Sequence, residues 1–298
     1  MNRLTANLLM LLAASIWGLA FVAQATAMET IGPIWFLGIR FLLAALVIAP
    51  FALNEKRKAP MPIPRPMLGL VGLITLAFFA ASMLQQIAML GATVTNAGFL
   101  TGLYVPFTPL IGLLIFREWP HRLVWPCAAL ALAGTWLLSG GIVSLGWADG
   151  LLILSAIAFA IQMLLMGHAV PATGRPVTIT FLQMLATGTL GCLVAPFFEP
   201  ISWEAIRSAG VEILYAGVLS GGLAYTLQAV GQRYTPAADA AIVLSSEAPF
   251  AAIFGVLLLG ERINPVGLLG CAMIFAAIVI VQVAPMWRAR PAAVPEPQ

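Results

Sequence analysis

Apolar runs of about twenty residues follow one another along almost the whole chain, separated by short breaks rich in charge, proline or glycine. A helix of that length crosses the hydrocarbon core of a bilayer, which is about 30 Å thick. Strands of a membrane barrel would instead alternate over segments of about ten residues. Only 8% of the residues are charged, far below the roughly 25% of soluble domains. The sequence therefore predicts an all-α integral membrane protein.

Ten such runs are expected to be transmembrane helices. The first run could also be a secretory signal peptide, because it ends in the small residues "AQATA". Its apolar part is longer than the roughly 7 to 15 residues of a signal core, which favours an uncleaved helix. The expected spans are residues 5–25, 33–53, 67–89, 95–116, 123–140, 148–168, 176–197, 210–230, 238–259 and 264–284.

The basic residues lie in the breaks and predict an orientation. The long polar segment "NEKRKAPMPIPRP" at residues 54–66 is expected in the cytoplasm, where Lys and Arg accumulate. Ten spans then place both termini in the cytoplasm and leave Arg207 and Arg262 outside. We expect a multi-pass protein of the cell (inner) membrane that binds no nucleic acid. The basic residues expected inside are Arg3, Lys56, Arg57, Lys58, Arg65, Arg117, Arg122, Arg175, Arg233, Arg288 and Arg290.

The two halves of the chain resemble each other. A single constant shift aligns 96–118 with 239–261 without a gap, and we call this shift the repeat offset. Such spacing predicts a duplication, with residues 1–143 and 144–298 each forming five spans. Because five is odd, the second half must enter the membrane from the opposite face, as in the inverted repeats of secondary transporters. The repeat offset places Pro106 on Pro249, Phe107 on Phe250, Gly112 on Gly255, Glu118 on Glu261, Gln85 on Gln228 and Tyr104 on Glu247.

These landmarks, with "AASIWGLAFV" in the first run, "NAGFLTGLYVPFTPL", "SSEAPFAAIFGVLLLGE" and Arg40, resemble the drug/metabolite transporter superfamily. The resemblance covers the chain and is to the ten-helix branch with two EamA repeats, including bacterial amino-acid exporters of the YddG type. It implies a basket of helices around a central cavity, whereas family substrates range from amino acids to nucleotides, sugars and drugs. One departure is "SAIAFAI" at 155–161, where the family often has Trp, so an aromatic wall is expected from other spans.

Polar residues at helical spacing are candidates for that cavity. Phe78, Ser82 and Gln85 share one helix face, and Tyr225 and Gln228 lie at repeat-related positions. Hydrogen bonding between helices is the alternative explanation for such residues. Further candidates are Trp17, Asn96, Thr101, Gln162, Gln183 and Ser246.

The fourth and ninth runs are interrupted by proline at matching places. Pro106 and Pro109 lie in one and Pro249 in the other. Matched interruptions indicate a binding site near the midplane, where loosened backbone reaches the substrate, so these prolines are predicted hinges. Kinks that serve only packing are the alternative.

Arg40 and Glu247 are charges inside apolar runs, where each is costly unless it is paired or lines water. Tyr104 is the repeat equivalent of Glu247. Three hypotheses follow for the two charges: an ion pair that braces the halves, a substrate site in which Arg40 holds a carboxylate and Glu247 an ammonium, or a Glu247 that carries protons for coupling.

The function expected is secondary transport. No HExxH, DxD or Ser-His-Asp set indicates a membrane enzyme, and no P-loop indicates use of nucleotide energy. We expect export of small metabolites by alternating access, with neutral or aromatic amino acids favoured. Drugs, nucleotides or sugar metabolites are the alternative substrates, and a membrane enzyme is the other class. Neither a metal nor another cofactor is expected, and the predicted partners are a small-molecule substrate and the lipid bilayer, with a monomer as the assembly.

Overall fold

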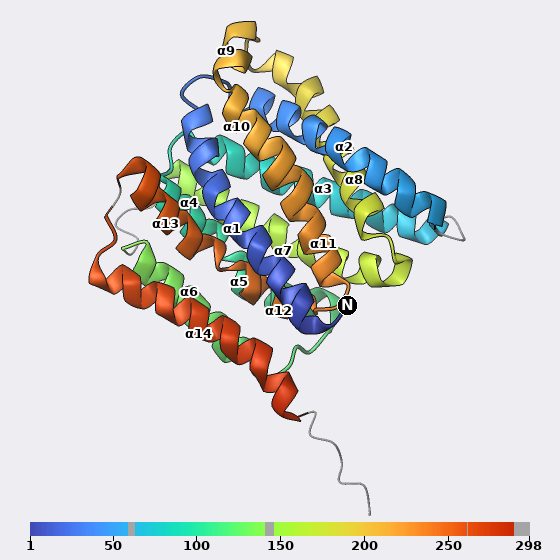
Figure 1. Ribbon diagram of the computed structural model, residues 1–298, viewed down its shortest axis with the longest axis vertical. Coiled ribbons are helices and arrows are strands. Elements are labelled where there is room, and N and C mark those ends of the chain that lie inside the picture. Colours follow the sequence, from blue (N-terminus) through green and yellow to red (C-terminus); the bar gives the residue numbers. More distant parts are fainter. Residues whose placement is uncertain (59–62, 141–145, 261, 289–298) are drawn as a thin grey trace, which may run out of the picture.

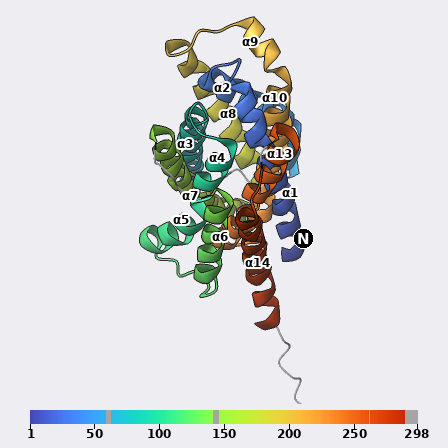
Figure 2. The ribbon, with the colours of Figure 1, turned by 90° about the vertical axis from the view of Figure 1, so that its left-hand side faces the viewer.

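The structure, a computed structural model, describes residues 1–58, 63–140, 146–260 and 262–288. This part of the chain is helical throughout and contains no strand, which confirms the all-α prediction. Figures 1 and 2 show the long helices packed side by side, with the short helix α9 at one end of the bundle. The helices are α1 (Arg3–Ala27), α2 (Pro33–Lys58), α3 (Arg65–Ala88), α4 (Val94–Thr101), α5 (Tyr104–Ile111), a π-helix (Gly112–Phe116), α6 (Val124–Leu138), α7 (Trp147–Thr173), α8 (Pro176–Val194), a 3-10 turn (Ala195–Phe197), α9 (Trp203–Ser208), α10 (Gly210–Leu214), a second π-helix (Tyr215–Ala224), α11 (Tyr225–Gln232), α12 (Ala237–Leu244), α13 (Glu247–Leu259) and α14 (Pro265–Arg288).

Eight helical segments of the described chain are long and apolar enough to cross a membrane. Two further apolar helices, at Val124–Leu138 and Pro265–Val281, are shorter. All ten predicted runs are thus helical; α6, at 15 residues, falls short of a full span by length, whereas α14 runs over 24 residues. The prediction of a polar loop at 54–66 is wrong about where the loop begins, because α2 continues to Lys58. Its last turn carries three basic residues, which interact favourably with the carbonyl end of the helix.

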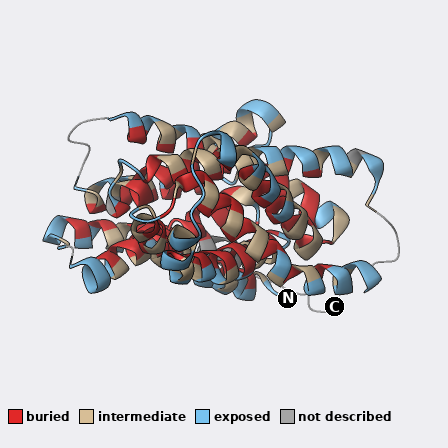
Figure 3. Cartoon of the chain, turned by 90° about the horizontal axis from the view of Figure 1, so that it is seen from above, coloured by how far each residue is buried: buried red, intermediate tan, exposed pale blue. Residues whose placement is uncertain are grey.

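The exterior of the bundle is apolar. Figure 3 shows buried residues gathered between the helices and exposed residues around them. Many exposed side chains are large and hydrophobic, such as Leu46 and Leu114, each 71% exposed. Such a surface matches lipid rather than water.

The fourth and ninth predicted runs are both broken into two half-helices. One break is at Gly102–Leu103 and the other at Ser245–Ser246, which the repeat offset places on each other. Each break precedes a proline that lacks the N–H for an α-helical bond. The N–H of Val105 bonds instead to the Gly102 carbonyl at 3.0 Å, and that of Ala248 to the Ser245 carbonyl at 3.2 Å.

The sequence suggested that the prolines mark the breaks. In the structure each of them lies after the break instead. Pro106 and Pro249 each occupy the third position of the following half-helix, where a missing N–H leaves no bond unmade. Pro109 lies inside α5. Glu261, the predicted partner of Glu118 in the duplication, and Arg290 lie outside the described residues.

Helices α2 and α8 pack with their backbones in contact. A Cβ added to Gly188 would lie 2.5 Å from the backbone nitrogen of Leu42, and one added to Gly38 would lie 2.7 Å from that of Cys192. Only glycine allows this approach, the small-residue packing found between membrane helices. Helices α6 and α14 form a second close pair at one edge of the bundle, through Gly134 and Gly270.

The start of each helix of the α2–α8 pair also receives a glutamate, one from the segment after α8 and one from the end of α2. The Glu199 carboxylate accepts from the N–H groups of Ile34 and Trp35, both at 3.0 Å, at the start of α2. At the other end, Glu55 of α2 accepts from the N–H of Thr178 at 2.7 Å, at the start of α8. N–H groups at a helix start have no partner within the helix and attract negative charge. The pair is therefore tied at both ends.

The α2–α8 contact can be tested with one methyl group. We expect Gly188→Ala to lower the melting temperature of the purified protein in detergent, since overpacking costs about 1–3 kcal/mol. Gly69→Ala is the matched control, because nothing lies within 4 Å of a Cβ at that position. Equal melting temperatures for the two variants would contradict the close packing of this pair.

Candidate functional site: a central cavity with separated charges

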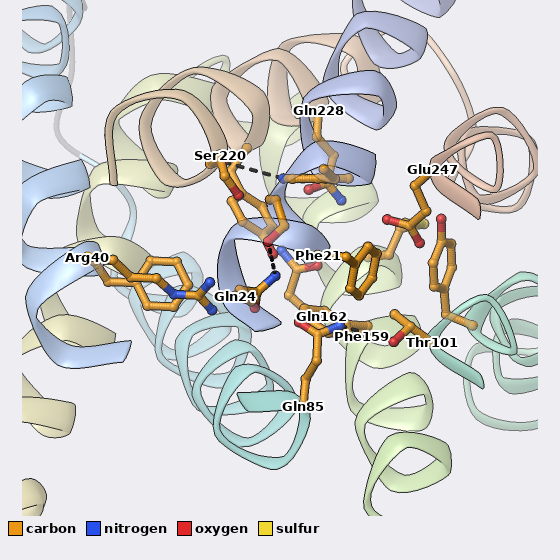
Figure 4. A pocket seen from close by; sticks show the side chains of 16 residues that line it. Phe21, Gln24, Arg40, Gln85, Thr101, Phe159, Gln162, Ser220, Gln228 and Glu247 are labelled. Carbon is orange, nitrogen blue, oxygen red and sulfur yellow. Dashed lines mark hydrogen bonds between the residues drawn. The ribbon is translucent and has the colours of Figure 1, made fainter. Parts of the chain in front are cut away.

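A cavity in the middle of the bundle gathers residues from helices far apart in the sequence. Its volume is about 50 Å³, less than the roughly 300–1,000 Å³ of small-molecule sites, so the cavity is narrow in this structure. Figure 4 shows its walls, which are aromatic rings, carboxamides and two charged side chains. The lining residues are Trp17, Ala20, Phe21, Gln24, Arg40, Phe41, Gln85, Thr101, Tyr104, Phe159, Gln162, Met163, Ser220, Tyr225, Gln228 and Glu247.

Arg40 lies on one side of this cavity and is only 4% exposed. Its guanidinium is 4.6 Å from the ring centroid of Phe41 and 5.2 Å from that of Phe36, so both rings stabilise the cation. Its Nε has no hydrogen-bond partner. Among the described residues, the charge is thus held by aromatic faces and has no counter-ion.

Glu247 lies on the opposite side of the cavity, with Phe21 and Gln24 between it and Arg40 in Figure 4. The ion pairs among the described residues are Arg3–Asp239 and His168–Glu118. The predicted ion pair between Arg40 and Glu247 is therefore absent. The cost of two charges inside apolar runs suggested it, but the sequence does not tell on which side of a cavity a residue stands.

The break in the ninth run explains how Glu247 is tolerated in an apolar segment. Glu247 is the first residue of α13, so its carboxylate lies at a helix N-terminus, where the macrodipole favours negative charge. The side chain of Tyr104, the first residue of α5 and the repeat equivalent of Glu247, lies beside it. The Glu247 Oε1 atom and the Tyr104 hydroxyl have no hydrogen-bond partner. The two side chains nevertheless lie close enough to interact, and together they present polar atoms to the cavity.

Aromatic rings form the wall between the charges. The Trp17 and Tyr225 ring centroids are 4.6 Å apart, and Trp17 donates its indole N–H to the Ser220 carbonyl at 3.3 Å. Behind them, Phe78 contacts Tyr225 at 4.9 Å and Phe159 at 6.2 Å, both edge-on. Such packing fixes ring orientation. The wall presents flat apolar faces to the cavity.

Carboxamides supply the remaining polar groups. Gln85 donates to the Thr101 hydroxyl at 3.1 Å, and Gln162 donates to Gln183 at 3.0 Å. Gln24 donates to the carbonyl of Ala20, but its own carbonyl oxygen is buried without a partner. Buried polar groups normally find partners, so an orphan beside a cavity is a candidate ligand contact.

The structure brings Gln162 and eight of the other thirteen predicted lining residues to this cavity. Among the others, Phe78 packs behind the wall and Ser82 is buried with a hydroxyl that has no partner. Asn96 donates to Asp149 instead, and Ser246 bonds to the Val243 carbonyl within its own turn. Gln183 reaches the site only through Gln162. The eight lining residues are Trp17, Arg40, Gln85, Thr101, Tyr104, Tyr225, Gln228 and Glu247.

Other lining residues were not singled out from the sequence. Phe159 belongs to "SAIAFAI", so the expectation that this segment contributes no aromatic wall is wrong. Ser220 lies in the π-helix Tyr215–Ala224, whose wider turn brings Ser220 to the cavity, while Gly221 packs against Ala44 of α2. Phe21 and Gln24 follow Trp17 at helical spacing, and that spacing could have found them.

Comparison with known families fits this arrangement. The family described as EamA-like transporter family matches residues 4–140 and again 146–283. The chain belongs to this family. It is a multi-pass membrane protein of a transporter family, and the family relationship indicates transport rather than catalysis.

Several related proteins match this chain over nearly its full length. An uncharacterized transporter of Archaeoglobus fulgidus is 29% identical, over 94% of this chain and 86% of the relative. The uncharacterized transporter YwfM of Bacillus subtilis is 28% identical over 94% of both chains. An S-adenosylmethionine/S-adenosylhomocysteine transporter of Chlamydia trachomatis is 26% identical, over 90% of this chain and 88% of the relative. A solved crystal structure shares the fold with a TM-score of 0.78 at 16% identity, over 96% of this chain and 99% of that one.

No described residue is a counter-ion for Arg40, so we expect its replacement to affect stability and function differently. We expect Arg40→Met to melt at or above the temperature of the unaltered protein, because it removes a buried charge that no described residue neutralises. The same variant should lose substrate binding. Arg207→Met, at an exposed position, is the matched control and should change neither property. A large fall in melting temperature for Arg40→Met alone would show that Arg40 braces the fold.

Proposed function

We propose that the protein is a secondary transporter of small metabolites that carry an amino-acid group, with neutral and aromatic amino acids as the first candidates. The observation that carries the proposal is the pair of buried, opposite charges that face one cavity without pairing with each other. A charge inside a membrane protein needs a partner. A substrate with a carboxylate and an ammonium supplies both partners.

The proposed contacts follow from the chemistry of each wall. Arg40 binds the substrate carboxylate, for which its guanidinium provides paired donors. Glu247 binds the ammonium, and Trp17 and Tyr225 contact the apolar side chain. Because the charges stand on opposite sides of the cavity, a small amino acid reaches both only when the walls close on it. Substrate binding thereby favours a closed state.

A second candidate substrate is S-adenosylmethionine or S-adenosylhomocysteine. The separation of the charges across the cavity favours a molecule longer than a simple amino acid. The aromatic faces suit an adenine ring, and the carboxamides of Gln24 and Gln228 suit its polar edge. The name of the chlamydial relatives agrees with this class. Drugs, nucleotides without an amino-acid group and sugar metabolites are the remaining alternatives.

The proposed mechanism is alternating access between inverted halves, residues 1–143 and 144–298. Two matches to the family and two helix breaks related by the repeat offset support it. In this proposal the chain crosses the inner membrane ten times as a monomer, with both termini in the cytoplasm, and exports its substrate. Pro106, Pro109 and Pro249 hold the broken helices in shape beside the hinges.

Counterflow into liposomes tests the function directly. Purified protein is reconstituted, and uptake of labelled Thr, Met, Phe, Trp and S-adenosylmethionine is measured against an excess of each unlabelled compound inside. We expect accumulation of at least one amino acid above that in protein-free vesicles. Accumulation of S-adenosylmethionine alone would select the second candidate. No accumulation by folded protein across the panel would reject both.

The proposed role of Glu247 separates substrate binding from proton coupling. We expect Glu247→Gln to weaken binding of the transported amino acid by roughly tenfold, the effect of losing a charged hydrogen bond. Binding of the analogue without its amino group should not change. Exposed Glu204→Gln serves as the control. An equal loss for both ligands would contradict an ammonium contact, and loss of pH dependence alone would indicate a proton carrier.

A further inference from the structure

Two polar contacts join the first turns of the half-helices to other helices. Asn96, in the first turn of α4, donates its amide N–H to the carboxylate of Asp149 in the first turn of α7. Asp239, in the first turn of α12, forms an ion pair with Arg3, the first residue of α1. We call the first contact the α4 latch and the second the α12 latch.

The two latches occupy matching positions in the two halves. Asn96 and Asp239 are related by the repeat offset, which also relates the helix breaks, and each is the third residue of its half-helix. Their partners also correspond, since each stands at the start of the first helix of the other half. Asp149 lies in α7 and Arg3 in α1. Each contact therefore joins the first turn of a half-helix to the first turn of the first helix in the other half.

The latches lie at opposite ends of the bundle. The last turns of α1, with Phe21 and Val22, pack in one cluster with Val94 at the start of α4 and Ala148 at the start of α7. The α4 latch is thus at the far end of α1 from Arg3. At the near end, the Thr235 hydroxyl also donates to Asn7 of α1, at 2.9 Å, just before α12 begins.

Each half-helix runs from its latch to the cavity. Thr101, the last residue of α4, lines the cavity, and Glu247 lines it just after the end of α12. All residues from 238 to 246 are buried, so α12 fills the space between the cavity and the end that holds Arg3. A second hollow opens at that end, with Arg3, Thr108 and Asp239 among its lining residues. Opening the cavity toward either end requires the half-helix there to move about its break.

We propose that α4 and α12 are the two gates of the transporter and that the Asn96–Asp149 and Arg3–Asp239 contacts are their latches, one for each end. The proposal rests on the proposed transport function. Both latches are closed in this structure. When one latch opens, its polar groups meet water at the end of the bundle. The free energy lost is small for a partly exposed group such as Arg3.

Cysteine accessibility tests the latches without a substrate. Cys127, Cys192 and Cys271 are first replaced by alanine, and the protein is placed in nanodiscs. Thr108→Cys reports opening at the α12 end, because Thr108 is fully buried but lines the second hollow. Met89→Cys, buried just after α3 in the cluster that holds the start of α4, reports opening at the α4 end. Each reporter is labelled with a hydrophilic maleimide.

The expected result is reciprocal. Arg3→Ala should label Thr108→Cys roughly tenfold faster, because it leaves the buried Asp239 without its ion-pair partner, and Met89→Cys more slowly. Asn96→Ala should do the reverse. Arg57→Ala, an exposed basic residue, is the matched control and should change neither rate. Should Arg3→Ala fail to fold, Asp239→Asn keeps the shape of the side chain and weakens the same contact.

Labelling that rises at both reporters together, or at neither, would overturn the proposal and leave the two contacts as ordinary helix bonds. A reciprocal shift combined with failed counterflow would instead keep the gates and reject the proposed substrates. A disulfide at each latch gives the second measurement. Oxidised Arg3→Cys/Asp239→Cys and Asn96→Cys/Asp149→Cys proteins should each stop transport, and reductant should restore it. Unchanged transport in the oxidised proteins would contradict gating.

Discussion

The backbone contact between α2 and α8 is the constraint on which the rest of the structure depends. Inside a bilayer no water replaces a lost hydrogen bond, so helix ends must find partners within the protein. Glu199 and Glu55 provide them at the two ends of this pair, and Gly38 and Gly188 allow the helices to touch between the ends. Arg40 stands two residues after Gly38. Its position at the cavity is therefore set by a contact that cannot slide.

The same pair shows how closely the two halves correspond. Pro33 and Pro176 open α2 and α8 and are related by the repeat offset, like the two helix breaks. Proline needs no partner at the first helical position, and in both helices the carboxylate is shared by the next two N–H groups. Three separate features, the reciprocal caps, the breaks and the latches, thus follow one spacing. Unrelated packing features would not recur at one residue spacing, so the shared spacing supports two inverted halves.

The positions of the helices could be read from the sequence, whereas the arrangement of the site was only partly predictable. Length and hydropathy locate a span because about twenty apolar residues are needed to cross the bilayer. Rotation about the helix axis is harder to predict, since a helix apolar on all sides has no distinct buried face. Phe159 was missed for that reason, whereas the helical spacing of Phe21 from Trp17 could have found it. Ser220 lies in a π-helix, which changes the register that a 3.6-residue period assumes.

The unpaired charges and the weak latches have one energetic logic. A carrier that alternates needs states of similar free energy, because a state favoured by several kcal/mol would hold nearly the whole population. At the end of the bundle, water can replace part of the Arg3–Asp239 contact when it opens, because the Arg3 side chain is 32% exposed although Asp239 is buried. A direct Arg40–Glu247 pair would instead lock the cavity shut and have to be broken by each substrate. In the proposed mechanism, holding the charges apart leaves the free energy of their neutralisation to the substrate, so that substrate binding shifts the population of states.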